Sequence, residues 1–208
     1  MTETTRDALI SQYTSIYESK RYGDTSIKNL RFVLPQVAAL KPASILDYGC
    51  GRSKLVDALS SSVGATASRY DPAIAEFSER PTGQFDLLIN IDVLEHIPED
   101  DLDAVLGEMR ALCREALIVI DTRPAETLLP DGSNAHCTLH DHAWWHERLA
   151  RTFGHVHPIQ VARRSRAAFR TWSLSPAEDK QVGRAIFRER LAYRWMKLFQ
   201  RSKPGSAD

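Results

Sequence analysis

The stretch Ser44-Ile45-Leu46-Asp47-Tyr48-Gly49-Cys50-Gly51-Arg52-Ser53 decides the fold of this chain. A short apolar run ends in an acidic residue, and two glycines separated by one residue follow it. This pattern predicts a strand over Ser44–Asp47, a tight turn, and a helix over Ser53–Ser61. Because glycine has no Cβ, the backbone of the turn can come close to a ligand, and the first N–H groups of the helix point toward the same place. We therefore expect a ligand site at this turn.

Three further apolar runs predict strands that each end at an acidic residue. They cover 65–70, 85–91 and 116–120, and the acidic residues at or just after their ends are Asp71, Asp92 and Asp121. Helical patterns separate the runs, and this alternation predicts an α/β fold with a doubly wound, mostly parallel sheet. Ligands of such sheets bind at the carboxyl ends of the strands. We expect these acidic residues, together with Asp47, to gather at that end.

Other patterns predict the remaining elements and the domain plan. The helices are expected over 5–19, 27–40, 101–113 and from the cap residue Asp141 to Phe153, and the last strands over 155–161 and 167–174. We predict a single domain over 1–178, with N-terminal helices and a lid in 1–42 and the core in 43–178. A basic amphipathic helix over 179–203 and a disordered tail over 204–208 are expected to follow it.

Composition sets the broad class of the protein. The chain has 208 residues, of which 43% are hydrophobic, and this is enough for one full core. It contains no 18-residue apolar run, and its first residues are polar, so we expect neither a membrane span nor a signal peptide. The three cysteines, Cys50, Cys113 and Cys137, form no Cys-x-x-Cys pair, which favours free thiols in a reducing, cytoplasmic setting.

The net charge of zero combines two parts of opposite charge. Residues 160–208 contain twelve Lys or Arg and four Asp or Glu, whereas residues 1–159 contain 15 and 23. The basic part includes the amphipathic pattern over 181–201. We leave three partners of this helix open: its own domain or a second subunit in a homo-oligomer, an anionic membrane surface met as a peripheral contact at the inner membrane, or an anionic substrate or nucleic acid.

The motifs resemble those of the class I S-adenosylmethionine (SAM)-dependent methyltransferases, whose fold is Rossmann-like with a seven-stranded type of sheet. Ile45–Gly51 is similar to the first motif of that family, which holds the methionine part of SAM. Asp71 matches the residue that takes the ribose hydroxyls, and Asp92–Pro98 is similar to the fourth-strand motif of many small-molecule methyltransferases. The resemblance implies that SAM is the cofactor. The expected cofactor contacts are Tyr22 as part of a lid, Asp47, Gly49, Cys50, Gly51, Asp71, Pro72, Asp92, Val93 and Leu94.

The glycine turn separates this chain from dinucleotide-binding folds, and the segment after Asp71 is shorter than in the methyltransferase family. A dinucleotide fold would want a third glycine, but position 54 is Lys, so a fold that binds NAD or a nucleotide sugar is the secondary interpretation. The gap between Asp71 and Phe85 normally holds a helix and a third strand in the methyltransferase family. Here only 73–80 can be helical, so we expect that strand to be shortened or absent, with the adenine contacts supplied by Ala73, Ile74 and Phe77.

The acceptor side is predicted from two histidines. His96 follows the fourth-strand motif, where an acceptor would approach SAM, and a neutral imidazole there can act as a general base. The alternative is that His96 only packs against its loop. His136 is the second catalytic candidate, and Asn134 and Trp144 are expected to contact the substrate. Trp144 can equally be core or lid packing.

The same segment contains further histidines whose purpose the sequence leaves open. His140, His142 and His146 lie close to His136, together with Cys137 and Asp141. Their spacing does not match a standard zinc pattern, so we predict no metal site and expect solvated or capping histidines, with a metal site as the alternative.

We predict methyl transfer to an oxygen, and as second choice a nitrogen, of a small molecule or glycan precursor. A nucleic-acid methyltransferase that uses the basic C-terminus is one alternative. Enzymes of that kind that act on base amino groups resemble an Asn/Asp-Pro-Pro-aromatic motif, but Ile91–Leu94 contains no proline. No nucleic-acid-binding fold accompanies the basic helix, so we do not expect nucleic acid as the partner. A non-catalytic SAM-fold partner subunit is the other alternative.

Overall fold

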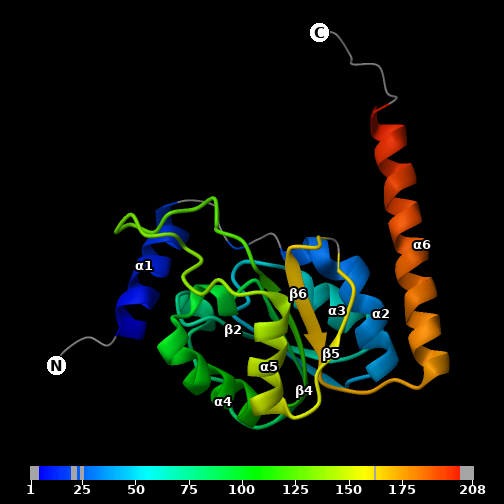
Figure 1. The fold of residues 1–208 in the computed structure, drawn as a ribbon, viewed down its shortest axis with the longest axis horizontal. Coiled ribbons are helices and arrows are strands. Elements are labelled where there is room, and N and C mark those ends of the chain that lie inside the picture. The colour runs from blue at the N-terminus through cyan, green and yellow to red at the C-terminus, as the bar shows by residue number, and fades with distance from the viewer. Residues whose placement is uncertain (1–4, 20–22, 24–25, 162, 202–208) are drawn as a thin grey trace.

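A six-stranded sheet forms the centre of the computed structural model, which describes residues 5–19, 23, 26–161 and 163–201 (Figure 1). The strand order is β2-β1-β3-β4-β6-β5. The first four strands pair in parallel, whereas β6 runs antiparallel to β4 and β5 runs antiparallel to β6. The expected α/β fold with a mostly parallel sheet is therefore confirmed. The strands are β1 Ser44–Tyr48, β2 Thr66–Tyr70, β3 Phe85–Ile91, β4 Cys113–Asp121, β5 His157–Pro158 and β6 Arg166–Arg170.

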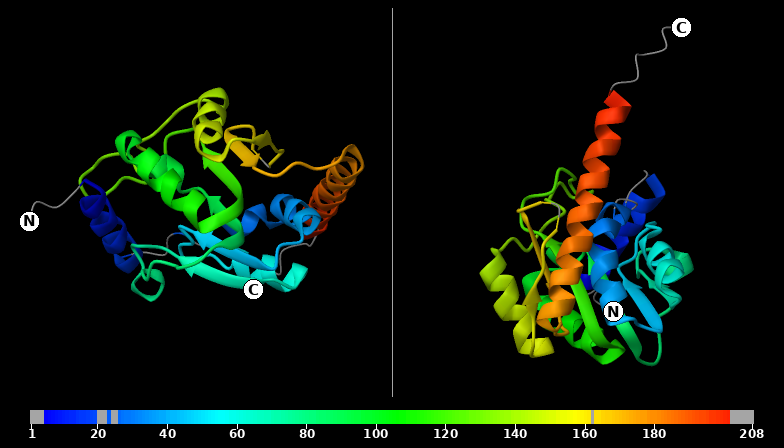
Figure 2. Two further views of the ribbon diagram at one scale, coloured as in Figure 1. Left: turned by 90° about the horizontal axis from the view of Figure 1, so that it is seen from below. Right: turned by 90° about the vertical axis from the view of Figure 1, so that its right-hand side faces the viewer.

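Helices cover both faces of the sheet (Figure 2). The helices are α1 Thr5–Ser19, α2 Leu30–Leu40, α3 Leu55–Val63, α4 Leu102–Leu112, α5 His142–Phe153 and α6 Pro176–Arg201, and short 3-10 turns are η1 Ser26–Asn29, η2 Ala75–Phe77, η3 Leu94–His96 and η4 Glu99–Asp101. Neighbouring residues of β3 point to opposite faces, as a strand requires. Leu88 packs in the core beneath α4 and α5, whereas Leu87 and Ile89 pack in the core beneath α2 and α3.

The third strand is absent, in agreement with the expectation, whereas the last edge strand is shorter than the sequence pattern predicts. Residues 71–84 contain only the turn η2, so neither the third strand nor a helix over 73–80 forms there, and β2 pairs with β1 alone. At the other end, the expected strand over 155–161 is reduced to His157–Pro158. Proline has no N–H to donate to a sheet, which is a physical reason for this short edge strand.

Helix α1 is held over the carboxyl ends of the strands by charge and by packing. The Arg6 guanidinium donates two hydrogen bonds, of 2.9 and 3.1 Å, to the carboxylate of Glu108 on α4. The hydroxyl of Tyr48, at the end of β1, donates to the same carboxylate at 2.9 Å. Ile16 is buried against Leu129 and Ala135 of the loop that precedes α5. The first helix thus forms one side of whatever site lies at this end of the sheet.

Helix α6 leaves the body of the molecule after its first turns (Figures 1 and 2). Val182 and Ile186 are buried against Phe32 of α2, whereas Phe187 and Leu191 expose 67% and 45% of their surface. Among the described residues, no helix combines the length and apolar character that crossing a bilayer requires. The predicted tail over 204–208 lies outside the described residues.

Replacing Leu88 tests the central position that β3 has in the core. Leu88→Ala removes a side chain with no exposed surface, so we expect the free energy of unfolding to fall by about 2 to 5 kcal/mol. Urea denaturation followed by circular dichroism measures it. Leu128→Ala is the control, because Leu128 is 59% exposed and its truncation is expected to change stability by about 0.5 kcal/mol or less. Equal losses in the two variants would contradict this packing.

Candidate functional site

The turn between β1 and α3 brings backbone close to backbone. Gly49 and Gly51 have φ angles of 78° and 53°, a region that favours glycine. A Cβ on Gly49 would lie 2.6 Å from Cγ2 of Val93, and a Cβ on Gly51 would lie 2.6 Å from the carbonyl oxygen of Gly23. Any side chain at these positions would therefore clash, and glycine lets Val93 and Gly23 pack directly against the turn. Ser53 then accepts a hydrogen bond of 3.2 Å from the N–H of Leu55, at the start of α3.

Asp71 connects the end of β2 to this turn. One carboxylate oxygen accepts hydrogen bonds from the Gly51 N–H at 2.9 Å and from the Tyr17 hydroxyl at 3.3 Å. The other accepts from the N–H of Ala73 at 3.0 Å. Burial raises the pKa of Asp71 above its ordinary value, although these bonds favour the charged form. The position is thus built to hold a carboxylate beside the turn.

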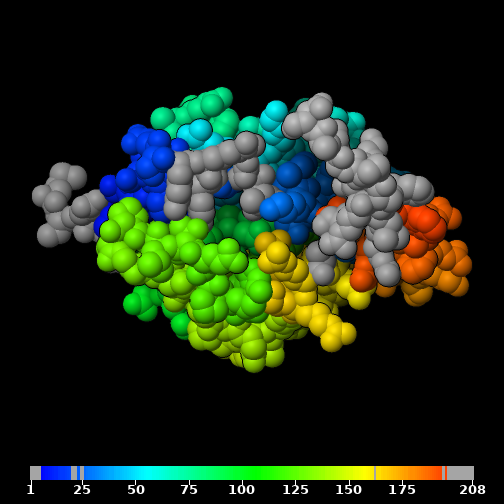
Figure 3. Space-filling view, turned by 90° about the horizontal axis from the view of Figure 1, so that it is seen from above, coloured from blue at the N-terminus to red at the C-terminus, as the bar shows by residue number. Residues whose placement is uncertain are grey.

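A cavity of about 1680 Å³ lies at the carboxyl ends of the parallel strands. Figure 3 looks onto this end of the molecule, where the surface is recessed between the side of α1 and the side of α6. Nine of the residues expected to bind the cofactor or to act in catalysis line the cavity. They are Gly49, Cys50, Gly51, Asp71, Pro72, Asp92, Val93, His96 and His136. The structure therefore brings the glycine turn, the end of β2 and the two candidate histidines to one space.

Other expected site residues lie away from this wall. Asp47 and Leu94 are buried, with 3% and no exposed surface, and Leu94 packs in the core beneath α4 and α5. Trp144 stacks on His140 with ring centroids 3.7 Å apart and packs against the same core. Tyr22 lies outside the described residues.

Asn134 holds the loop rather than facing the cavity. Its amide exchanges hydrogen bonds of 3.0 and 2.9 Å with the backbone of Ala125, and its oxygen also accepts from the His136 N–H at 2.9 Å. These bonds use the polar atoms that a substrate contact would need. They also fix the backbone of His136, so the geometry gives Asn134 a positioning role.

Asp47 is a buried carboxylate at the end of β1. Its Oδ2 has no hydrogen-bond partner among the described residues. Burial raises the pKa of Asp47 to about 7, despite an opposing effect from Arg69. Near neutral pH this carboxyl is therefore close to half protonated, and its energetic effect on the fold depends on pH.

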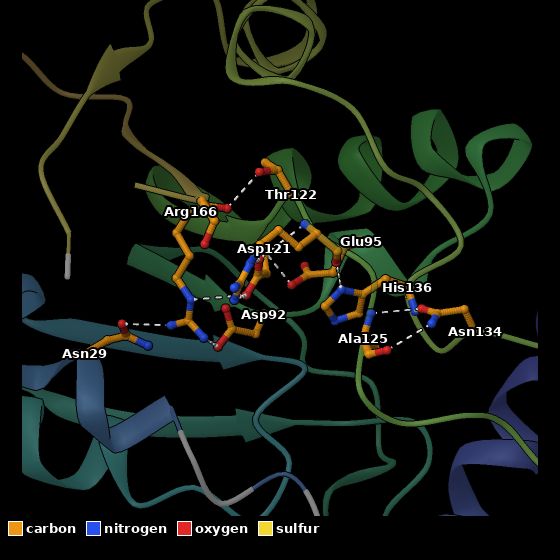
Figure 4. A network of polar contacts seen from close by, with 11 residues as sticks. Asn29, Asp92, Glu95, Asp121, Thr122, Ala125, Asn134, His136 and Arg166 are labelled. Atoms are coloured by element: carbon orange, nitrogen blue, oxygen red, sulfur yellow. Dashed lines mark hydrogen bonds and ion pairs between the residues drawn. The ribbon is translucent and has the colours of Figure 1, made fainter. Parts of the chain in front are cut away.

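Asp92, directly after β3, belongs to a second cluster of polar side chains (Figure 4). Its φ of 58° directs the chain sharply into the turn η3. The Arg166 guanidinium, from β6, lies 2.9 Å from one Asp92 oxygen and also donates a hydrogen bond of 3.1 Å to Asn29. Sequence reasoning did not single out Arg166, because only the antiparallel return of β6 beside β4 brings it to this place.

Glu95 is the second residue that sequence reasoning missed. Its side chain is fully buried, and Oε1 accepts a hydrogen bond of 2.9 Å from the N–H of Asp121. Burial and the nearby Asp92 carboxylate raise the pKa of Glu95 well above its ordinary value. Glu95 lies within the fourth-strand motif Asp92–Pro98, directly before His96, and this position is the feature of the sequence that could have identified it.

His96 and His136 lie side by side with ring centroids 4.7 Å apart. Nδ1 of His96 is 2.8 Å from the carbonyl oxygen of Ala135 and 2.7 Å from the Tyr13 hydroxyl. Nδ1 of His136 is 2.5 Å from the carbonyl oxygen of Arg123. Burial, together with the neighbouring His136, lowers the pKa of His96 to about 4, so this ring is neutral at physiological pH.

The other histidines of the same segment have separate partners. Nε2 of His140 lies 2.8 Å from Oε2 of Glu99, and Nε2 of His146 lies 3.1 Å from the carbonyl oxygen of Val156. His142 is exposed at the start of α5, where the Asp141 carboxylate accepts a hydrogen bond of 2.9 Å from the Trp144 N–H and caps the helix as expected. The metal set considered from the sequence, His140 and His142 with His136 or His146, does not form among the described residues.

The profile of the family described as Methyltransferase domain matches residues 17–198. The chain belongs to this family. It is therefore a methyltransferase of the class I type, for which SAM is the methyl donor, and the resemblance seen in the sequence motifs is confirmed. No curated protein shows significant sequence similarity to the chain.

Solved structures support the same fold. One is the 1,6-didemethyltoxoflavin-N1-methyltransferase of Burkholderia thailandensis, with 1,6-didemethyltoxoflavin and S-adenosylhomocysteine bound; the two share 17% identity over 82% of this chain and 88% of that one, with a TM-score of 0.57. An O-methyltransferase family protein of B. thailandensis shares 12% identity over 85% and 64% of the two chains (TM-score 0.54). Human N-acetylserotonin methyltransferase, in complex with SAM, shares 12% identity over 83% and 57% (TM-score 0.52). At these identities the likeness shows the fold.

The buried carboxyl of Asp47 predicts a specific dependence of stability on pH. The pKa of this group is about 7 in the folded chain and ordinarily 3.8, so its contribution to stability is fully present below about pH 4 and is lost as pH rises through 7. Asp47→Asn does not titrate. We expect its stability relative to wild type to increase between pH 4 and 8, by about 4 kcal/mol at most. Urea denaturation at a series of pH values measures the difference.

Glu108→Gln provides a comparison of opposite sign. The hydrogen bond from Arg6 holds the pKa of Glu108 below its ordinary value of 4.5, so Glu108 contributes stability above that pH and loses the contribution as pH falls. Glu108→Gln is therefore expected to be less stable than wild type at pH 7, and by a smaller margin at pH 4. A stability difference for Asp47→Asn that does not change with pH would contradict the burial of an uncompensated carboxyl.

Proposed function

We propose that this methyltransferase transfers the methyl group of SAM to an oxygen, and as second choice a nitrogen, of a small molecule or glycan precursor. One observation carries the proposal: a single cavity joins the glycine turn and Asp71 on one side to His96 and His136 on the other. The similar structures include an N-methyltransferase and an O-methyltransferase family protein, so they support methyl transfer without choosing the acceptor atom.

The residues of the glycine turn fit the cofactor. Gly49 and Gly51 have positive φ angles and pack directly against Val93 and Gly23, which fixes the shape of the turn at the cavity wall where a ligand can lie against the chain. The Asp71 carboxylate lies at the same wall, and three of its about four acceptor positions are used, so it can accept two ribose hydroxyls once the Tyr17 hydroxyl, 3.3 Å away, is displaced. We assign the methionine part of SAM to the turn and its ribose to Asp71.

The chemistry then depends on how the chain positions the acceptor. When bound, SAM supplies an electrophilic methyl group on a positively charged sulfur. His96 and His136 are held rigidly by carbonyl oxygens and face the cavity, so they can orient an acceptor hydroxyl by hydrogen bonds. Good orientation of two reactants can lower a barrier by several kcal/mol. Because the pKa of His96 is about 4, this ring is a weak base, and orientation is its stronger contribution.

The size of the cavity favours an acceptor bound together with the cofactor. Ligand pockets commonly measure about 300 to 1,000 Å³. The cavity here measures about 1680 Å³ and extends from α1 to residues Ala185 and Glu189 of α6. This space fits a cofactor and an acceptor of appreciable size at once. A protein that had lost catalysis and served only as a partner subunit would have no need to maintain both sides of such a cavity.

Helix α6 carries the proposals about partners and location. Phe187 and Leu191 expose apolar surface on a helix that also contains Arg184, Arg188 and Arg190. A second copy of the chain or an anionic membrane surface would each cover these side chains. Both remain proposals, with a cytoplasmic, peripheral location for the second.

Removal of the Asp71 carboxylate tests the cofactor site. We expect Asp71→Ala to weaken SAM binding at least about tenfold, or about 1.4 kcal/mol, because a charged acceptor of two hydrogen bonds is lost. Isothermal titration calorimetry measures the dissociation constant, and a thermal melt checks the fold. Asp103→Ala is the matched control, since the Asp103 carboxylate lies on α4 and is 76% exposed. An unchanged dissociation constant in Asp71→Ala would show that the ribose assignment is wrong, and wild type that binds no SAM would reject the proposed function.

A double substitution tests the surface of α6. Light scattering measures self-association of wild type, and sedimentation with anionic vesicles measures membrane contact. The double variant Phe187→Ser with Leu191→Ser is expected to lose the association that wild type shows in either assay. Leu139→Ser, an exposed position elsewhere in the chain, is the control. Wild type that is monomeric and leaves the vesicles unbound would reject both partners.

A further inference from the structure

The cavity contains three side chains that together resemble a metal-binding set. Glu95 and His96 come from η3, and His136 comes from the loop between β4 and α5. One possible ligand atom of each lies within 4.8 Å of those of the other two. All three residues line the cavity. Figure 4 shows Glu95 and His136 from these two separate segments within one polar network.

Both histidine rings present the nitrogen that a metal ion needs. Nδ1 of His96 lies 2.8 Å from the Ala135 carbonyl oxygen, to which Tyr13 also donates, and Nδ1 of His136 lies 2.5 Å from the Arg123 carbonyl oxygen. A carbonyl oxygen only accepts, so we assign the proton of each ring to Nδ1, which leaves a lone pair on Nε2. Histidines that bind metals typically donate their other N–H in this way.

Glu95 supplies a carboxyl oxygen that lacks a partner. Oε1 accepts the hydrogen bond from Asp121, but Oε2 is buried with no hydrogen-bond partner among the described residues. A buried carboxylate without compensation is costly, and a cation beside Oε2 would remove that cost. The nearby Asp92 and Asp121 add negative charge, whereas Arg166 and Arg123 pair with those two carboxylates rather than with Glu95.

We propose that Glu95, His96 and His136 bind one divalent transition-metal ion, of the class of Fe²⁺, Co²⁺ or Zn²⁺. Two imidazole nitrogens and one carboxylate oxygen favour these ions over Mg²⁺ and Ca²⁺, which prefer oxygen ligands. Ligand atoms about 2.1 Å from one ion lie about 3 to 4 Å apart, so the three side chains, whose ligand atoms lie within 4.8 Å of one another, need to approach by at most about 2 Å. Three protein ligands leave coordination positions open to the cavity.

The role of the ion rests on the proposed function. An acceptor hydroxyl that coordinates the ion becomes more acidic and releases its proton to solvent. The acceptor oxygen then forms a bond to the methyl carbon of SAM while the C–S bond breaks, and the electron pair of that bond stays on sulfur, which gives S-adenosylhomocysteine. No oxidant or reductant is required.

A Co²⁺ titration of the full-length, EDTA-treated protein tests the site. We expect one Co²⁺ per chain, detected by visible absorption bands and by calorimetry. Glu95→Gln and His136→Ala are each expected to weaken Co²⁺ binding at least about tenfold. His155→Ala is the matched control, because His155 is exposed beyond the end of α5 and lies outside the cluster. Thermal melts check the fold of each variant, and His136→Gln replaces His136→Ala if the latter does not fold.

Two outcomes would overturn the metal site. One is wild type that binds no Co²⁺ at about 1 mM, and the other is binding that Glu95→Gln and His136→Ala leave unchanged. A SAM titration of the same samples keeps the two proposals distinguishable. Wild type that binds SAM but not Co²⁺ rejects the metal site alone, whereas wild type that binds Co²⁺ but not SAM rejects the methyl-transfer function and leaves the ion site established.

Discussion

The site depends on the close packing that two glycines allow between the turn after β1 and its neighbours. Gly49 contacts the side chain of Val93 after β3, Gly51 lies against the backbone of Gly23, and the Gly51 N–H donates to Asp71 after β2. A Cβ at either glycine would lie 2.6 Å from a neighbouring atom, so neither position has space for one. The turn therefore fixes the relative positions of the strand ends, where Asp71 and Asp92 line the cavity.

Buried carboxylates are the energetic consequence of this arrangement. Burial raises the pKa of Asp47, Asp71, Asp92 and Glu95, and within the described part of the chain only Asp92 has an arginine in direct contact, Arg166. Stability alone would favour apolar or neutral side chains at such places. Groups with perturbed pKa values that gather in one cleft are typical of functional sites, so their combined burial supports a site that acts on a ligand. The two apolar cores supply the stability that offsets the cost of burying these carboxylates at the strand ends.

The sequence predicts elements well where local pattern decides the structure and poorly where tertiary contacts decide it. Strand β3 is predicted to the residue, Phe85–Ile91, because a continuous apolar run ends sharply at a polar residue. Asp71 is predicted to lie beside the glycine turn because strand ends meet in a parallel sheet. Asn134 shows the limit: its loop is predicted correctly near the cavity, but its amide binds Ala125. Arg166 carries no local signal, because only the pairing of β6 with β4 brings it to Asp92.

The state of His96 constrains how the acceptor is activated. An efficient general base has a pKa near the working pH, whereas burial and His136 hold the pKa of His96 at about 4. Its Nδ1 is also committed to the Ala135 carbonyl oxygen and the Tyr13 hydroxyl. A neutral, rigid ring with one lone pair on Nε2 is poorly suited to remove a proton from the acceptor hydroxyl. It is well suited to hold a bound group in a fixed position beside the acceptor. Activation of the acceptor therefore has to come from the electrostatics around His96, where Glu95 and His136 are its immediate neighbours.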